Sequence, residues 1–135
     1  AALPGGFDAA LWTGLGELGA LGLRVAEDKG GLGLGLLDAV LLMEQAGRTL
    51  VSGPLAEALV AASLLADLGG DADLLEEAIA GATVVTLAMH DVALQPVQLV
   101  AGGGAAQAVI ARRGDEVVLV RRSPRAEAEK TLAST

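Results

Sequence analysis

The sequence has no cysteine and almost no aromatic residues: one tryptophan, one phenylalanine and no tyrosine among 135 residues. The absence of cysteine excludes a disulfide framework, thiolate metal sites and a cysteine nucleophile. It is compatible with a reducing compartment, and we expect a cytoplasmic protein. With aromatic residues at 1%, a core must be built from the Leu, Val and Ala that dominate the 53% hydrophobic share. Each buried leucine stabilises the fold by about 1.5–3 kcal/mol, so such a core is feasible.

Basic residues are also scarce, with nine Lys and Arg against seventeen Asp and Glu and a net charge of −8. Binding to nucleic acid requires clustered positive charge, so the balance argues against a nucleic-acid partner. One basic cluster comprises Arg112, Arg113, Arg121, Arg122 and Arg125. We interpret it as the solvated ends of a hairpin, with a phosphate site as the alternative.

Long apolar runs are missing as well. No stretch reaches the roughly 18 apolar residues of a membrane span, and the first residues show no basic segment followed by an apolar run. We therefore expect no membrane partner and no signal peptide. The frequent Ala, Gly, Leu, Val and Arg are typical of a GC-rich bacterial genome.

The first part of the chain has the periodicity of a helical domain, which we predict over residues 1–82. The expected helices cover residues 7–21, 36–49, 54–68 and 73–80. In the second of them, Leu37, Val40, Leu41 and Glu44 lie on one side. The first contains Gly14, Gly16 and Gly19, which weaken a helix and indicate that another backbone packs closely against it.

After Gly81 the chain becomes β-branched, and we predict strands at residues 83–87 and 98–101 and a hairpin of 108–112 with 116–121. About 50 residues is few for a complete sheet domain. The predicted fold class is therefore α+β, with an all-α helical domain followed by a partial antiparallel β domain over residues 83–135.

The glycine-rich loop at residues 30–35 has two interpretations. It could cradle a phosphate, but no Lys-Ser/Thr follows it and no strand precedes it. The interpretation we favour is a tight loop that tucks Leu32, Leu34 and Leu36 under a helix bundle.

Candidate catalytic groups are few. His90, the single histidine, precedes Asp91, but neighbours in a strand point to opposite faces, so the pair is not expected to act together as a base. The acidic pairs are Asp71 with Asp73, Glu76 with Glu77, and Glu127 with Glu129. They lack calcium-loop spacing, and we expect neither a metal site nor a catalytic residue.

Residues 18–68 carry a succession of motifs. Gly22-Leu23-Arg24-Val25-Ala26-Glu27 is similar to a "GL-x-x-PE" step, and Gly30-Gly31-Leu32-Gly33 is similar to a "GG-x-G" loop. Glu44-Gln45-Ala46-Gly47-Arg48 matches a helix ending in "E-x-x-GR", and Pro54-Leu55 matches the start of the next helix. In this order and spacing they resemble the N-terminal helical domain of the acyl-CoA dehydrogenase family.

The resemblance implies a helical domain, a β middle domain and a C-terminal helix bundle, assembled as dimers or tetramers. Members remove the α proton of an acyl-CoA with a glutamate and pass the β hydride to FAD. That glutamate belongs to the C-terminal bundle, which has no counterpart in these residues. The resemblance also implies that Pro54 and Leu55 help line the acyl-chain cavity.

At the flavin-contacting strand end, where the family has "A-L-T-E-P", this chain reads Ala88-Met89-His90-Asp91-Val92. His90 and Asp91 are thereby the candidate cofactor contacts, although both replace the usual residues. We expect a degenerate or partner subunit of a flavin-dependent enzyme acting on fatty or sterol side-chain acyl-CoA esters. It would form a homo- or hetero-oligomer with another acyl-CoA dehydrogenase chain and have FAD in the assembled complex. The alternative is a non-enzymatic helical interaction module.

Overall fold

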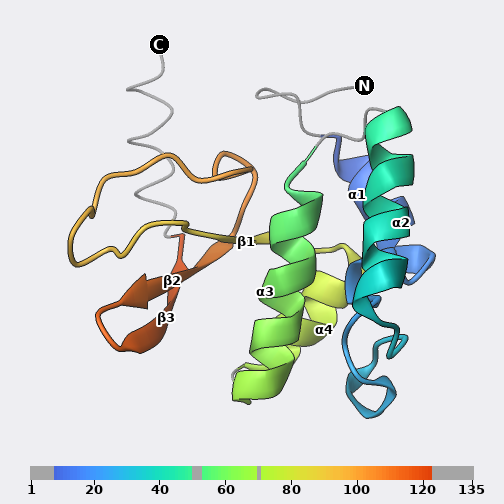
Figure 1. Ribbon diagram of the computed structural model, residues 1–135, viewed down its shortest axis with the longest axis horizontal. Helices are drawn as coiled ribbons and strands as arrows, with labels where there is room; N and C mark the ends of the chain where they lie inside the picture. Colours follow the sequence, from blue (N-terminus) through green and yellow to red (C-terminus); the bar gives the residue numbers. More distant parts are fainter. Residues whose placement is uncertain (1–7, 50–52, 70, 123–135) are drawn as a thin grey trace.

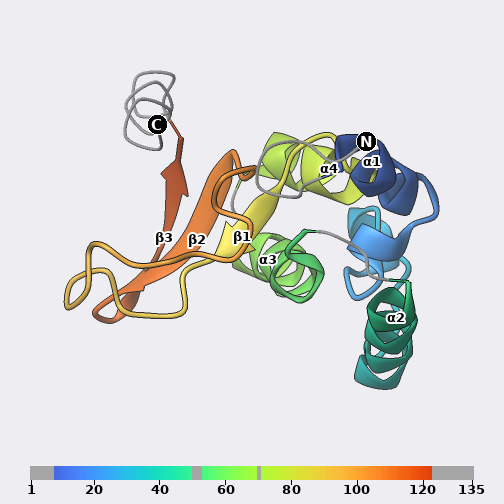
Figure 2. The same ribbon diagram turned by 90° about the horizontal axis from the view of Figure 1, so that it is seen from above.

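The computed structural model describes residues 8–49, 53–69 and 71–122. The helices are α1 (Ala9–Glu17), α2 (Leu36–Arg48), α3 (Leu55–Leu68) and α4 (Ala72–Ala80), with 3-10 turns at Ala20–Gly22 and Glu27–Lys29. The strands are β1 (Val85–Leu87), β2 (Ala108–Arg113) and β3 (Glu116–Arg121). In Figures 1 and 2, α3 lies between the sheet and the pair α1 and α2.

Helix boundaries follow local capping. Asp8 accepts a hydrogen bond from the Leu11 N–H at 3.1 Å, and Asp71 accepts one from Leu74 at 3.0 Å. These carboxylates satisfy backbone donors that the first helical turn leaves free. The prediction that the first helix runs to residue 21 was wrong, because Gly19 adopts a left-handed φ of 83° and a 3-10 turn follows.

Asp71 also ties the sheet to the helices, because the guanidinium of Arg121 in β3 bonds its carboxylate. The Leu74 N–H, and after it the Arg121 charge, hold the pKa of Asp71 below its ordinary value of 3.8. The end of β3 is thus fixed against the beginning of α4.

The described sheet has the order β1-β2-β3. The predicted hairpin is confirmed: β2 and β3 pair antiparallel around Gly114, whose φ is 62°. The α+β class is confirmed, but the sheet is mixed, since β1 runs parallel to β2. The long connection over residues 88–107 makes this possible by returning the chain to the end of the sheet where β1 began.

The expected strand at residues 98–101 was wrong, because this segment belongs to that connection. Its described hydrogen bonds involve side chains instead of a backbone ladder. Thr86 donates through Oγ1 to the Ala101 carbonyl at 2.8 Å, and Gln98 bonds the backbone of His90.

Two clusters of Leu, Val and Ala form the core, and α3 contributes to both. One cluster joins Ala61, Ala62 and Leu65 of α3 to Val85 and Ile110 of the sheet. The other joins Leu55 and Leu59 of α3 to Trp12 and Leu21. The helices and the sheet therefore share buried surface, while the division at residue 82 stays a prediction.

Helix α2 turns its leucine-rich side outward. Leu37, Val40 and Leu41 are 51–71% exposed, whereas Ala39 on the other side is buried. Figure 2 shows α2 at the edge of the helical part, far from the sheet. The side of α2 identified from the sequence is therefore uncovered among the described residues.

Two glycines of α1 give a test of backbone crowding. A Cβ at Gly16 would lie 2.1 Å from the Ala80 carbonyl oxygen, whereas a Cβ at Gly14 meets nothing within 4 Å. We expect Gly16→Ala to lower the free energy of unfolding by about 1–3 kcal/mol, because α4 must move. Gly14→Ala should raise it by about 1 kcal/mol, since alanine favours the helix. Urea denaturation followed by circular dichroism measures both, and equal stability of the two variants would contradict the packing.

Candidate functional site

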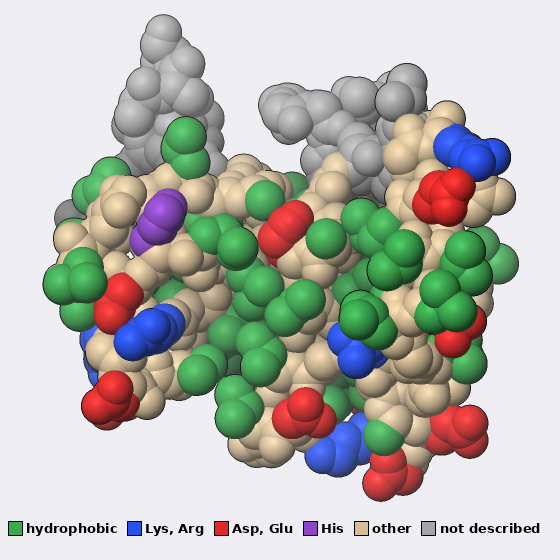
Figure 3. Space-filling model, viewed as in Figure 1, with side chains coloured by type: hydrophobic (Ala, Val, Ile, Leu, Met, Phe, Trp, Pro, Cys, Tyr) green, Lys and Arg blue, Asp and Glu red, His purple; other side chains and the backbone are tan. Residues whose placement is uncertain are grey.

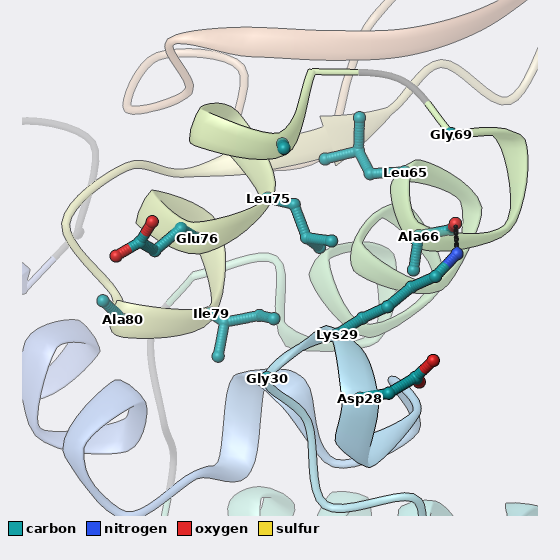
Figure 4. Close-up of a pocket in the computed structure, with 11 residues that line it drawn as sticks. Asp28, Lys29, Gly30, Leu65, Ala66, Gly69, Leu75, Glu76, Ile79 and Ala80 are labelled. Atoms are coloured by element: carbon teal, nitrogen blue, oxygen red, sulfur yellow. Dashed lines mark hydrogen bonds between the residues drawn. The ribbon is translucent and has the colours of Figure 1, made fainter.

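A cavity of about 740 Å³ lies between the 3-10 turn at Glu27–Lys29, the end of α3 and one side of α4 (Figure 4). Its apolar surface comes from Leu65, Leu75 and Ile79. This volume lies within the usual range of small-molecule pockets, about 300–1,000 Å³.

The lysine of this cavity has a structural role. The side chain of Lys29 extends along the cavity, and its ammonium donates to the Ala66 carbonyl near the end of α3. A cation is favourable there, because the last carbonyls of a helix carry partial negative charge. Figure 4 shows the carboxylates of Asp28 and Glu76 on different sides of the cavity. The lining includes no histidine or hydroxyl side chain, and its apolar part can bind an apolar group.

The glycine loop beside this cavity does not cradle a phosphate. Its N–H groups all donate within the chain: Gly30 to Glu27, Gly31 to Ala26, Leu32 to Gly22, Gly33 to Val25, Leu34 to Leu23, and Gly35 to the Asp38 carboxylate. An anion would find no free backbone donor here. A Cβ at Gly31 would lie 2.0 Å from the Val25 carbonyl oxygen, which explains the glycine.

The tight-loop interpretation is confirmed for the backbone and wrong for the leucines. Leu32, Leu34 and Leu36 are exposed instead of tucked under the helices. Together with the outward side of α2 they leave a broad apolar surface. Figure 3 shows hydrophobic side chains gathered over α2 and α3.

An apolar groove of about 310 Å³ separates α2 from α3. Its lining comprises Arg24, Leu36, Ala39, Val40, Met43, Ala56, Leu59, Val60, Ser63 and Leu64. Leu37 and Leu41 follow Leu36 and Val40 of the lining in the sequence of α2 and are also exposed. We call Leu36, Leu37, Val40 and Leu41 the α2 surface.

The predicted acyl-contacting residues, Pro54 and Leu55, lie at the start of α3. Pro54 is buried against Gly102, where a Cβ would come within 2.4 Å of its ring. Leu55 is 4% exposed and belongs to the core cluster of Trp12, although one edge lines a groove between the end of α2 and the start of α3. Contact with an acyl chain stays a prediction for both.

The structure gives His90 and Asp91 different surroundings. His90 is exposed, and its N–H donates to Gln98 Oε1 at 3.0 Å. The carboxylate of Asp91 accepts from the Ala93 N–H at 2.9 Å and from the Gly114 N–H at 3.1 Å. These two bonds, followed by the charge of Arg112 at 3.9 Å, hold the pKa of Asp91 below 3.8.

Asp91 therefore fastens the segment after β1 to the turn of the β2–β3 hairpin. Sequence reasoning missed this role, since it requires a contact between residues 23 positions apart. The Gly114-Asp115 turn was recognisable, but nothing in the sequence paired it with Asp91. The sequence also did not indicate that the side-chain amide of Gln98 bonds the backbone of His90.

Three backbone donors around residues 88–92 are not available to a flavin. The N–H groups of Ala88 and Val92 donate to the carbonyls of Ile110 and Arg112, both at 2.9 Å. The N–H of His90 and the carboxylate of Asp91 are engaged as described. A flavin ring requires donors directed at its oxygen and nitrogen atoms, and these groups are directed into the protein.

Metal and membrane roles find no structural support in the described part of the chain. Residues 8–49, 53–69 and 71–122 contain no group of three or more His, Asp or Glu able to hold a metal ion. None of the helices described there is both long and apolar enough to cross a bilayer.

Comparison with known proteins agrees with the helical part of this geometry. A family model described as the acyl-CoA dehydrogenase N-terminal domain matches residues 3–73. The chain therefore belongs to the acyl-CoA dehydrogenase family, as its motifs indicated.

Two relatives illustrate how much of the family the chain covers. It is 37% identical over 86 residues to acyl-CoA dehydrogenase IpdE2 of Mycobacterium tuberculosis. The aligned residues make up 62% of this chain and 27% of IpdE2. It superposes on the steroid ACAD Tcur3481-Tcur3483, solved as a variant, with a TM-score of 0.70 and 27% identity. That match covers 88% of this chain and 40% of the solved chain. The chain thus spans less than half the length of either relative.

The clamp at Asp91 has a testable pH dependence. Because its pKa is lowered in the folded state, the ionised carboxylate stabilises the fold above pH 3.8, and this contribution is lost as the pH falls through the folded-state pKa. We expect Asp91→Asn to be less stable than the wild type at neutral pH and to lose less stability on acidification. Urea midpoints from neutral pH to about pH 3 measure this, with Asp115→Asn as the matched charge control. Equal acid sensitivity of Asp91→Asn and the wild type would contradict the clamp.

Proposed function

We propose that this chain is a supporting component of a flavin-dependent acyl-CoA dehydrogenase and works beside another chain of the same family. The observation that carries the proposal is a contrast within the chain. Its helical part belongs to the family, while the backbone N–H groups of Ala88, His90 and Val92 donate within the protein. The second chain supplies the flavin, which accepts the hydride, and the glutamate that takes the α proton.

The contribution of this chain is apolar surface. The cavity beside Lys29 and the groove between α2 and α3 are lined mainly by Leu, Ala, Ile and Val, which suit an aliphatic or ring-containing acyl group. Pro54 and Leu55 are the proposed acyl contacts at the start of α3. His90 is exposed and is the remaining proposed contact for a flavin held by a neighbouring chain, with Asp91 holding its segment in place.

The α2 surface supports oligomer formation. Four large apolar side chains in successive turns are exposed, and such contiguous patches mark interaction sites in soluble proteins. We propose that this surface contacts the other acyl-CoA dehydrogenase chain, in a homo- or hetero-oligomer.

The proposed substrates are acyl-CoA thioesters. Esters of steroid side chains come first, because the solved relative is a steroid ACAD; fatty acyl-CoA esters come second. The frequent Ala, Gly, Leu, Val and Arg favour a bacterial source, and the lack of cysteine is compatible with the cytoplasm as the proposed setting. Residues 1–82 and 83–135 are the proposed domains.

A non-enzymatic helical interaction module is the second candidate. It is favoured by the lining of the 740 Å³ cavity, where the Lys29 ammonium is bonded to the Ala66 carbonyl and the carboxylates of Asp28 and Glu76 lie on different sides. This candidate predicts partner binding without flavin in any complex.

Flavin absorbance tests the proposal. We expect the chain to be colourless when purified alone, and to co-purify with flavin and acyl-CoA-oxidising activity when expressed with a second acyl-CoA dehydrogenase chain. The double variant Leu37→Lys with Leu41→Lys should lose co-purification, because it charges the α2 surface. Leu99→Lys, on an exposed loop position, is the matched control and should retain it. Flavin bound by this chain alone would overturn the supporting role, and a colourless complex would favour the interaction module.

A further inference from the structure

Thr86 of β1 is the one fully buried polar side chain in the described part of the chain. Burying a hydroxyl without a partner costs free energy, and the other two residues of β1, Val85 and Leu87, are apolar. The Thr86 hydroxyl is satisfied by the Ala101 carbonyl, to which it donates at 2.8 Å. Thr86 thereby ties β1 to the turn at residues 101–105, which we call the 101–105 turn.

Arg122, directly after β3, bonds the same turn. Its Nη1 donates to the Gly104 carbonyl at 2.9 Å, and its Nη2 donates to the Gly103 carbonyl. Its backbone N–H donates to the Gln107 carbonyl at 2.9 Å, so the guanidinium is carried by a backbone that is itself fixed. Because a guanidinium is planar and rigid, two bonds to neighbouring carbonyls restrain their orientation as well as their position. The turn is therefore bonded to the first and the last described strand.

Between these bonds the turn lies against the start of α3. Gly102 has a φ of 65°, and a Cβ there would lie 2.4 Å from Cγ of the buried Pro54 ring. Glycine meets both requirements, the left-handed conformation and the close approach. Ala106, which follows the turn, is buried in the same core cluster as Leu55 and Trp12. The turn and the first residues of α3 therefore belong to one packed unit.

The start of α3 has no capping side chain. Helices α1 and α4 begin at Asp8 and Asp71, whose carboxylates accept a hydrogen bond from the first turn, whereas the N-cap of α3 is Pro54. Proline has no N–H and no polar side chain, so it cannot cap a helix in this way. The position of this helix end therefore depends on packing, and Gly102 supplies part of that packing.

We propose that Thr86 and Arg122 are positioning residues for the start of α3. By holding the 101–105 turn against Pro54, they fix where Pro54 and Leu55 present their apolar surface to an acyl group. Only the acyl contact rests on the proposed function; the coupling between the turn and α3 does not. A displacement of about 1 Å forfeits up to about half of the dispersion energy of an apolar contact, so a small shift of the turn is enough to weaken acyl binding.

A double-mutant cycle tests the coupling. Gly102→Ala should lower the urea midpoint of unfolding, because its Cβ meets the Pro54 ring, and Pro54→Ala in the same chain should restore part of that loss. Gly114→Ala is the matched control. Its φ of 62° gives similar backbone strain, but nothing lies within 4 Å of its Cβ, so Pro54→Ala should give no relief.

The comparison of the two glycine variants decides the outcome. If Gly102→Ala alone does not fold, recovery of folding on adding Pro54→Ala supports the coupling. No recovery, or an equal effect of Pro54→Ala on Gly102→Ala and on Gly114→Ala, would overturn it.

Trp12 gives a spectroscopic measurement, because it is the single tryptophan and lies in the core cluster of Leu55. Thr86→Val removes the hydroxyl and keeps the β-branched shape. We expect its emission without denaturant to shift to longer wavelength, since a displaced helix start admits water to the cluster. Thr86→Ser keeps the hydroxyl and should retain the wild-type emission. So should the matched control Thr83→Val, whose lost hydroxyl bonds the exposed Glu77 carboxylate. Wild-type emission from Thr86→Val would contradict the positioning role.

The complex with the second chain tests the consequence for acyl binding, with octanoyl-CoA as the probe. Thr86→Val and Arg122→Gln should each raise KM about threefold or more and leave kcat within about twofold, as expected when binding weakens without a change in the chemical step. Arg113→Gln is the matched control, since Arg113 bonds Glu116 within the hairpin, and it should keep the wild-type KM.

The two proposals fail in different ways. An unchanged KM in Thr86→Val and Arg122→Gln would overturn their effect on acyl binding. A complex without flavin would overturn the proposed function, and the double-mutant cycle would still decide whether the turn positions α3.

Discussion

The close approach of backbone to backbone at glycine is the constraint on which the rest of this structure depends. With 1% aromatic residues, the core cannot be filled by a few large side chains, and its elements must come close together. A Cβ at Gly16 would clash with Ala80, one at Gly81 would lie 2.6 Å from the Trp12 carbonyl oxygen, and one at Gly31 would clash with Val25. These contacts hold α1, α4 and the glycine loop in fixed positions around α3.

Compactness of this kind also limits chemistry. In the glycine loop every N–H from Gly30 to Gly35 bonds within the chain, and the same holds for the N–H groups of Ala88, His90 and Val92 beyond β1. Groups that satisfy one another in this way are unavailable to a phosphate or a flavin. What the described part of the chain offers is apolar surface: the cavity beside Lys29, the groove between α2 and α3, and the α2 surface.

The α2 surface and strand β3 are far apart. Figures 1 and 2 show α2 and β3 at opposite ends of the molecule, on either side of α3. A contact at one end therefore leaves the other accessible.

The sequence by itself determined the family, the α+β class and most elements. Helix α2 and the hairpin around Gly114 are local features, set by periodicity and turn residues. The glycines of α1 indicated that a backbone packs closely there, but not that it belongs to Ala80. Tertiary structure alone decided that β1 runs parallel to β2, that Asp91 bonds Gly114, and that the leucines of α2 face outward. Each of these depends on which distant segment lies alongside. Periodicity identifies the apolar face of a helix but does not say which element covers it. The sequence around Asp91 likewise does not reveal that its carboxylate accepts a hydrogen bond from the distant Gly114 N–H.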